Sequence, residues 1–186
     1  MGNTYIPSAP YFNYNNNNNY NIPMNNIQYP CNNQYNDNTN IIYLTKTQSG
    51  CQTLKNKIIS DSNYANEILF PNVINNLKEI CKNFFGSSMI QTLLQVLKPE
   101  NIDLFLIKIS GDISEICLTE SGSLVMQALI GKIKNNNNNL LNKLIFYLNN
   151  TDLKKIFKST YGHHFFKYYL SVIHNEEFTN FIYFYL

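Results

Sequence analysis

A hydroxyl and a carboxamide stand four residues apart at two places in this chain, at Ser87 and Gln91 and again at Ser123 and Gln127. The second pair follows the first after 36 residues. On a helix, residues four apart lie on one face, one turn from each other. A serine hydroxyl and a glutamine amide placed in this way can together hydrogen-bond the edge of a nucleic-acid base. The residue types and their spacing therefore indicate recognition of bases.

These pairs are part of a longer internal repeat. Each pair follows a glycine, and the glycines recur at intervals of 36, 36 and 40 residues. The longest interval contains Asn135–Asn139, which we interpret as an insertion in a loop. Cys81 and Cys117 are also 36 residues apart, and we interpret them as small apolar residues at equivalent core positions. The repeated glycines are Gly50, Gly86, Gly122 and Gly162.

The segment after each glycine has the pattern of a helix with one apolar face. Apolar residues stand at i, i+3, i+4 and i+7 in three units, and the first unit fits less well. We predict that each unit has one helix that ends near the glycine and a second that begins directly after it. One such unit cannot bury both faces, so stacked neighbours must supply the core. The stripes are Ile90, Leu93, Leu94 and Leu97, then Met126, Leu129, Ile130 and Ile133, then Phe166, Tyr169, Leu170 and Ile173.

The predicted organisation is one all-α solenoid domain behind a tail. Residues 1–40 contain 15 Asn and 6 Tyr and little that could form a core, which predicts a disordered, low-complexity Asn/Tyr-rich tail. Residues 41–186 form the predicted repeat domain. Its repeats run over about 40–62, 63–98, 99–134 and 135–174, with the start of a fifth at 175–186.

Composition narrows the classes of function. The net charge of +2 is too small for binding nucleic acid by charge alone, so contact must rest on shape and stacking. The four cysteines form no Cys-x-x-Cys pair with a matching histidine cluster, and we predict no metal and no cofactor. The sequence has no phosphate-binding glycine loop and no nucleophile elbow, which favours a protein that is not an enzyme. It also has no apolar run long enough to cross a bilayer, so we expect no membrane partner.

The repeat cores resemble those of the Pumilio (PUF) family of RNA-binding proteins. The family pattern is a glycine, then Ser, Asn or Cys, then three residues and a Gln or Glu, at intervals of ~36 residues. The resemblance covers about residues 41–174. It implies a right-handed α-solenoid of about four repeats that binds single-stranded RNA. The segments that carry it are TQSGCQTLKNKI, NFFGSSMIQTLL, TESGSLVMQALI and STYGHHFFKYYL.

The resemblance also implies roles for particular residues. In the family, two side chains of each repeat contact a base edge, and a third between them stacks on bases. Ser with Gln implies adenine in the second and third repeats, and so an A-rich RNA. Lysine only donates, so Lys55 and Lys167 imply guanine atoms or a phosphate. The edge pairs are Cys51/Lys55, Ser87/Gln91, Ser123/Gln127 and His163/Lys167, and the stacking residues are Gln52, Ser88, Leu124 and His164.

Three roles follow as expectations. The first is cytoplasmic, post-transcriptional regulation of mRNA through 3′-UTR elements, by translational repression or decay, with deadenylase or repressor proteins as partners. The second, also within the family, is processing of ribosomal RNA in the nucleolus. The third is of another class: a protein-binding helical scaffold without RNA readout, in which the serines and glutamines are ordinary solvated residues.

Overall fold

The computed structural model describes residues 38–134 and 138–172, and every regular element in this part of the chain is helical. This confirms the predicted all-α fold class. The predicted tail up to residue 37 and the predicted fifth repeat at 175–186 lie outside the described residues. The elements are α1 (Asn38–Leu44), α2 (Gln48–Ser60), η1 (Tyr64–Leu69), α3 (Phe70–Val73), η2 (Ile74–Asn76), α4 (Leu77–Lys82), α5 (Phe84–Val96), α6 (Pro99–Ile109), α7 (Ile113–Cys117), α8 (Glu120–Lys134), α9 (Asn138–Asn149), α10 (Leu153–Lys158) and α11 (Thr160–Val172).

The repeats contain three helices where we predicted two. In the third repeat, the long helix α6 is followed by the short helix α7 and the long helix α8. A turn at Gly111 separates α6 from α7, since glycine is a poor helix former. The buried residues Ile109, Ile113 and Ile116 keep a helical spacing across this turn. The apolar periodicity therefore could not show that the helix breaks.

The first long helix of the second repeat is divided into η1, α3 and η2. Pro71 lies in the first turn of α3, and proline lacks the backbone N–H that a regular helix would use there. The π-helical η1 before it and the 3₁₀-helical η2 after it accommodate this interruption. The register of the repeat is kept, because buried Leu69 and Phe70 correspond to buried Phe105 and Leu106 in α6.

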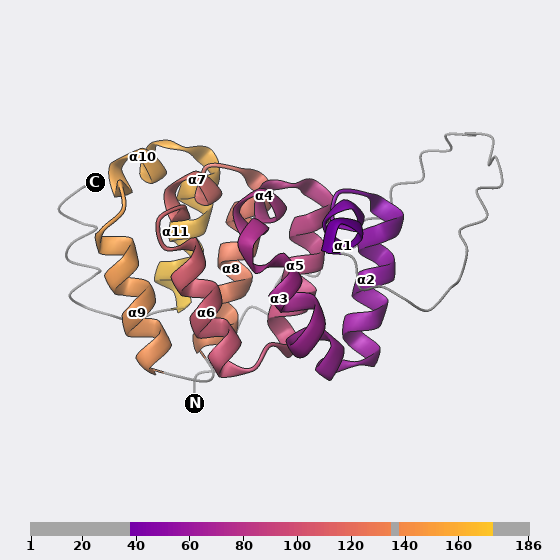
Figure 1. Cartoon of the computed structure of the whole chain (residues 1–186). Coiled ribbons are helices and arrows are strands. Elements are labelled where there is room, and N and C mark those ends of the chain that lie inside the picture. Colours follow the sequence, from indigo (N-terminus) through magenta and orange to yellow (C-terminus); the bar gives the residue numbers. More distant parts are fainter. Residues whose placement is uncertain (1–37, 135–137, 173–186) are drawn as a thin grey trace, which may run out of the picture. The chain divides into compact units, whose positions relative to one another are not determined.

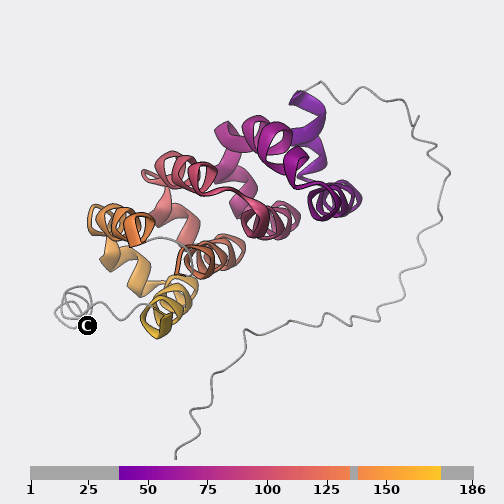
Figure 2. The same cartoon turned by 90° about the horizontal axis from the view of Figure 1, so that it is seen from below.

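The long helices are arranged in two rows (Figure 2). One row contains α2, α5, α8 and α11, which we call the ladder, and each ladder helix contacts the next. The opposite row contains η1 with α3, then α6, then α9. The short helices α1, α4, α7 and α10 lie along one edge of the array (Figure 1). This stacking of equivalent elements confirms the predicted repeat solenoid.

The core between the two rows is made of the predicted apolar stripes. Leu93 of α5 and Leu129 of α8 are fully buried, as are the residues that neighbour them in their stripes. Cys81 and Cys117 are buried at equivalent positions, as predicted, and burial raises the pKa of both thiols. In the fourth stripe, Ile173 lies outside the described residues. The stripes thus fix which face of each ladder helix is turned away from the core.

The repeated glycine is the third residue of each ladder helix, and does not precede the helix as we predicted. Its N–H donates to the side-chain oxygen of the residue three positions earlier, which caps the helix. Gly122 donates to Thr119 Oγ1 at 3.1 Å, and Gly86 donates to Asn83 Oδ1 at 2.9 Å. The corresponding caps of α2 and α11 are Thr47 and Ser159. Because the cap sets where each helix begins, the positions that follow it are in register from repeat to repeat.

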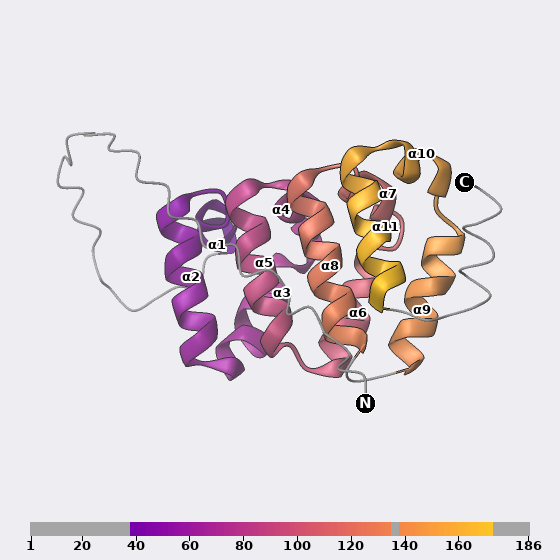
Figure 3. The same ribbon diagram turned by 180° about the vertical axis from the view of Figure 1, so that it is seen from behind.

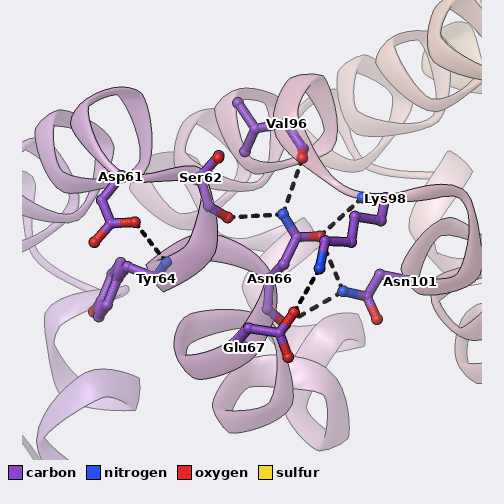
Figure 4. A network of polar contacts seen from close by, with 8 residues as sticks. All are labelled: Asp61, Ser62, Tyr64, Asn66, Glu67, Val96, Lys98 and Asn101. Carbon is purple, nitrogen blue, oxygen red and sulfur yellow. Dashed lines mark hydrogen bonds and ion pairs between the residues drawn. The ribbon is translucent and has the colours of Figure 1, made fainter.

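A buried amide joins the second repeat to the third (Figure 4). Asn66 of η1 is 3% exposed. Its Nδ2 donates to the carbonyl oxygens of Ser62 at 2.8 Å and Val96 at 3.0 Å. Its Oδ1 accepts from the N–H of Lys98 at 2.8 Å and from Asn101 Nδ2 at 3.0 Å. The turn between α5 and α6 is therefore held against η1, which fixes the start of the third repeat.

Candidate nucleic-acid interface

The predicted contact residues occupy the same three positions in each ladder helix. The edge residues are the fourth and eighth residues of the helix, and the stacking residue is the fifth. The helices begin at equivalent caps and pack side by side, as Figure 3 shows. These positions therefore form a row across α2, α5, α8 and α11. The structure brings together the residues that the sequence analysis grouped.

The fourth residue is buried in α2, α5 and α8, where it is Cys51, Ser87 and Ser123. Ser87 Oγ donates to the carbonyl oxygen of Phe84 in its own helix at 2.9 Å. Ser123 Oγ donates to the carbonyl oxygen of Tyr161 in the next ladder helix, also at 2.9 Å. Both hydroxyls are therefore paired inside the protein, with carbonyls at the starts of the helices, and are not free on the surface. A contact of these serines with a base stays a prediction.

The eighth residue is partly exposed in α2, α5 and α8, where it is Lys55, Gln91 and Gln127. Gln127 Nε2 donates to Ser123 Oγ at 3.3 Å, so the buried serine orients the amide. Lys55 Nζ donates to Ser88 Oγ at 3.0 Å, which joins the first repeat to the second. The carboxamide of Gln91 has no hydrogen-bond partner among the described residues. The two glutamines thus present amide groups at the same level of neighbouring helices.

The fourth repeat presents more of its predicted residues than the others do. His163, His164 and Lys167 are all exposed on α11. The stacking position holds exposed Gln52 in α2 and Leu124, which is 38% exposed, in α8. An imidazole ring can stack on a base, whereas Leu124 offers only an apolar contact. Of the predicted stacking residues, the one with a ring therefore lies in α11.

Positive charge gathers on the ladder, a feature that the sequence analysis missed. Within α2, α5, α8 and α11, all described in full, there are five lysines and one acidic residue, Glu120. In the opposite row, the acidic residues Glu67, Glu100 and Asp103 offset Lys108 and Lys143. The net charge of +2 averages over both rows, so it hid this division. A count of charges on each predicted helix would have found it. The ladder lysines are Lys55, Lys57, Lys132, Lys134 and Lys167.

The thiol of Cys51 is a neutral group in this row. Burial raises its pKa from 9.0 to about 11, and the positive charge of Lys55 opposes this rise only in part. Cys51 Sγ donates to the carbonyl oxygen of Thr45 at 3.1 Å. A thiol that keeps its proton near neutral pH is a poor nucleophile, so Cys51 acts here by packing and hydrogen bonding.

Residues 38–134 and 138–172 contain neither a metal-binding group of side chains nor a membrane-spanning helix. In this part of the chain, no three His, Cys, Asp or Glu side chains are grouped so that they could hold a metal ion. The helices described there are also too short or too polar to cross a membrane.

Comparison with known proteins identifies the type of repeat. Pumilio homolog 11 of Arabidopsis thaliana is 33% identical to the chain over 99 residues, which are 50% of this chain and 18% of that protein. The RNA-binding domain of Puf4, solved with the HO endonuclease RNA 3′ UTR recognition sequence, is 25% identical with a TM-score of 0.66, over 73% of this chain and 41% of that one. The RNA-binding domain of yeast Puf5p, solved with MFA2 RNA, is 18% identical with a TM-score of 0.65, over 72% and 37%. No protein-family model matches the chain.

The fold and the row of positions define an α-solenoid whose repeats each place three side chains in register on a ladder helix. The curated relative and the solved Puf4 domain support the assignment of the chain as a Pumilio (PUF) repeat protein. The chain spans less than half the length of each of these relatives.

Proposed function

We propose that the chain binds single-stranded RNA across the ladder. The observation that carries the proposal is the shared register of the fourth, fifth and eighth residues of α2, α5, α8 and α11. One repeat can present one set of side chains to one base, and neighbouring repeats to neighbouring bases. The solved Puf4 and Puf5p domains, which share this fold, are bound to RNA.

The eighth residue makes the main base contact in this proposal. The amides of Gln91 and Gln127 each supply donors and an acceptor, which suits the paired donor and acceptor of an adenine edge. Ser123 is buried and accepts from Gln127, so it positions the amide as well as filling the helix interface. Lys55 and Lys167 can only donate, and they contact phosphate or guanine.

The lysines of the ladder supply a second, sequence-independent part of the affinity. RNA carries one negative charge per phosphate, and each lysine that contacts a phosphate releases a counterion. Binding is therefore expected to weaken as salt is added. The opposite row, where acidic and basic residues offset each other, offers no such attraction.

The biological role that we propose is post-transcriptional regulation of mRNA in the cytoplasm, by repression of translation or by decay with a deadenylase. The Puf4 domain, which is 25% identical, was solved with a 3′ UTR recognition sequence, and this supports a messenger target. Crosslinking of RNA to the tagged protein in cells, followed by sequencing, tests the role. Recovery of 3′ UTR sequences supports it. Recovery of ribosomal RNA precursors from nucleoli contradicts it.

Fluorescence anisotropy with a labelled A-rich RNA tests the binding proposal. The variant Gln91→Ala/Gln127→Ala removes both ladder amides, and Asn142→Ala/Asn149→Ala removes two exposed amides from α9 as a matched control. A good bidentate base contact is worth about 1–3 kcal/mol, so the ladder variant is expected to lose about tenfold or more in affinity.

The control is expected to bind as the unchanged protein does. Circular dichroism establishes that both variants remain folded. Equal affinity of the folded ladder variant and the control contradicts base contact by the ladder. It favours a helical scaffold without RNA readout.

A further inference from the structure

We propose that a second RNA contact lies on α10, where Lys154, Lys155 and Lys158 bind phosphate groups of the RNA backbone beyond the last ladder helix. We call these three lysines the α10 patch. The inference rests on the proposed binding of RNA across the ladder, and it adds a site with a different chemistry. The ladder contacts bases as well as phosphate groups, whereas the α10 patch contacts phosphate groups only.

The α10 patch is exposed and has no ionic partner in the described part of the chain. All three side chains are exposed, and no carboxylate of residues 38–134 or 138–172 lies within ion-pair distance of them. The acidic residue next to the patch, Asp152, uses Oδ1 to accept the backbone N–H of Lys155 at 3.0 Å as a helix cap. Lys154 and Lys158 are four residues apart, a spacing at which like charges destabilise a helix. An anionic ligand would relieve this repulsion.

The equivalent lysines of the second repeat are neutralised by the next repeat. Lys78 and Lys82 hold in α4 the positions that Lys154 and Lys158 hold in α10. Lys78 Nζ lies 2.8 Å from Asp112 Oδ1 and 3.1 Å from Glu115 Oε1, and Lys82 Nζ lies 3.5 Å from Glu115 Oε2. The short helix α7 has no lysine. Along the row of short helices, unbalanced positive charge is therefore concentrated on α10.

The position of α10 suits an extension of the RNA path. The helix lies with the other short helices at one edge of the array and packs against α11 (Figures 1 and 3). One residue, Ser159, separates α10 from α11. The exposed His163, His164 and Lys167 follow in the first half of α11. An RNA that crosses the ladder at the level of these residues reaches α11 beside the α10 patch.

The chemistry of α10 favours phosphate over bases. A lysine ammonium donates hydrogen bonds and carries charge, and it has no acceptor with which to read a base edge. The aromatic residue of α10, Phe157, does not offer a stacking surface, because its ring stacks on Phe166 with centroids 4.1 Å apart in the core. Contact with α10 should therefore not depend on RNA sequence.

The test compares two variants of the full chain that lose the same charge. RNA affinity is measured by fluorescence anisotropy over a range of salt concentrations, with one labelled A-rich RNA of about twelve nucleotides, long enough to run past the ladder at one base per repeat. The control lysines lie outside the ladder and α10, and circular dichroism checks that both variants fold. The patch variant is Lys154→Gln/Lys155→Gln/Lys158→Gln, and the control variant is Lys98→Gln/Lys108→Gln/Lys143→Gln.

The patch variant is expected to lose about tenfold or more in affinity at low salt. Its plot of log K against log salt should be shallower by about two, since each of the three phosphate contacts to a single strand contributes about 0.7 to the slope. The control is expected to keep most of its affinity and its slope. Equal losses in both variants would overturn the inference, because net charge alone would then explain them.

The remaining outcomes separate this inference from the proposed function. Binding that is lost in Gln91→Ala/Gln127→Ala but unchanged in the patch variant overturns the α10 site alone. Absence of RNA binding by the unchanged protein, even at low salt, overturns both proposals. Polyglutamate is titrated as a second probe. If its binding requires the α10 patch and RNA binding does not, the patch is a surface for acidic protein, and the inference is wrong.

Discussion

Gly122 lies against the carbonyl group of Ile116, six residues earlier, so closely that a Cβ on the glycine would stand 2.1 Å from the carbonyl oxygen. The same relationship joins Gly162 to Ile156, also at 2.1 Å. In each case a ladder helix packs against the backbone of the short helix before it. The glycines have no positive φ, so close approach of the backbone is what requires them. The equivalent distances are 2.4 Å for Gly50 to Leu44 and 2.7 Å for Gly86 to Ile80.

Gly122→Ala is expected to destabilise the protein by about 1–3 kcal/mol, because a methyl group is forced into a packed interface and a backbone carbonyl cannot turn aside as a side chain could. The measurement is the free energy of unfolding from urea denaturation. Gly111→Ala is the matched control, since a Cβ at Gly111 meets nothing within 4 Å. It should be neutral or stabilise by up to about 1 kcal/mol. Equal effects of the two substitutions contradict the role given to Gly122.

Asn66→Ile is expected to destabilise the protein. The substitution introduces the residue type of the third repeat, where the equivalent residue is the buried Ile102. The substitution leaves the N–H of Lys98 and the carbonyl of Val96 without their partner. Each buried polar group left unpaired costs about 1–3 kcal/mol, so we expect a loss of about 3 kcal/mol in urea denaturation.

Asn72→Ala is the control for this substitution, because its amide in α3 donates to the carbonyl oxygen of Ile68 in η1 at the surface, within one repeat. It should cost much less than Asn66→Ile. If Asn66→Ile leaves the stability unchanged, the amide is not what joins the second repeat to the third.

The repeat and the buried faces of the ladder helices could be predicted from the sequence, because burial requires apolar residues at fixed positions. Leu93 and Leu129 are 36 residues apart because both must fill the same place between two rows of helices. The apolar stripe and the glycine recur in fixed register because this packing recurs in each repeat. The ladder, and the side chains that it carries in register, follow from these two signals alone.

The burial of polar side chains in the candidate site could not be predicted, because the spacing of residues in the sequence does not show whether a polar group is buried. Ser87 and Ser123 have the residue type of a surface contact, yet carbonyls of Phe84 and Tyr161 accept their hydroxyls inside the structure. The division into three helices was hidden because the apolar spacing continues through Gly111. The caps, by contrast, left a readable signal: a Thr, Asn or Ser three residues before each repeated glycine. That signal places the start of each ladder helix, and it was overlooked.

Ser123→Ala is expected to destabilise the protein by about 1 kcal/mol or more, because it removes a hydrogen bond between two repeats and leaves the carbonyl of Tyr161 without this donor. Ser87→Ala should cost less, since Ser87 donates to Phe84 within its own helix. Urea denaturation of the two variants measures the difference. The reverse order of stability contradicts the assignment of Ser123 as the residue that joins α8 to α11.

The protein is expected to lose stability as the pH rises from about 9 to above 11, because burial raises the pKa of three thiols in the folded state. In the unfolded chain these thiols ionise near their ordinary value of 9.0, whereas folded Cys51 keeps its proton until about pH 11, and Cys81 and Cys117 keep theirs still longer. The folded state then binds more protons than the unfolded state, so the free energy of unfolding falls as the pH increases.

The measurement is the urea midpoint at about pH 8 and about pH 10. Cys81→Ala/Cys117→Ala should show a smaller fall between the two values, whatever its stability at the lower one. A fall of the same size in that variant would mean that other groups, such as the Lys78 ion pairs with Asp112 and Glu115, cause the pH dependence.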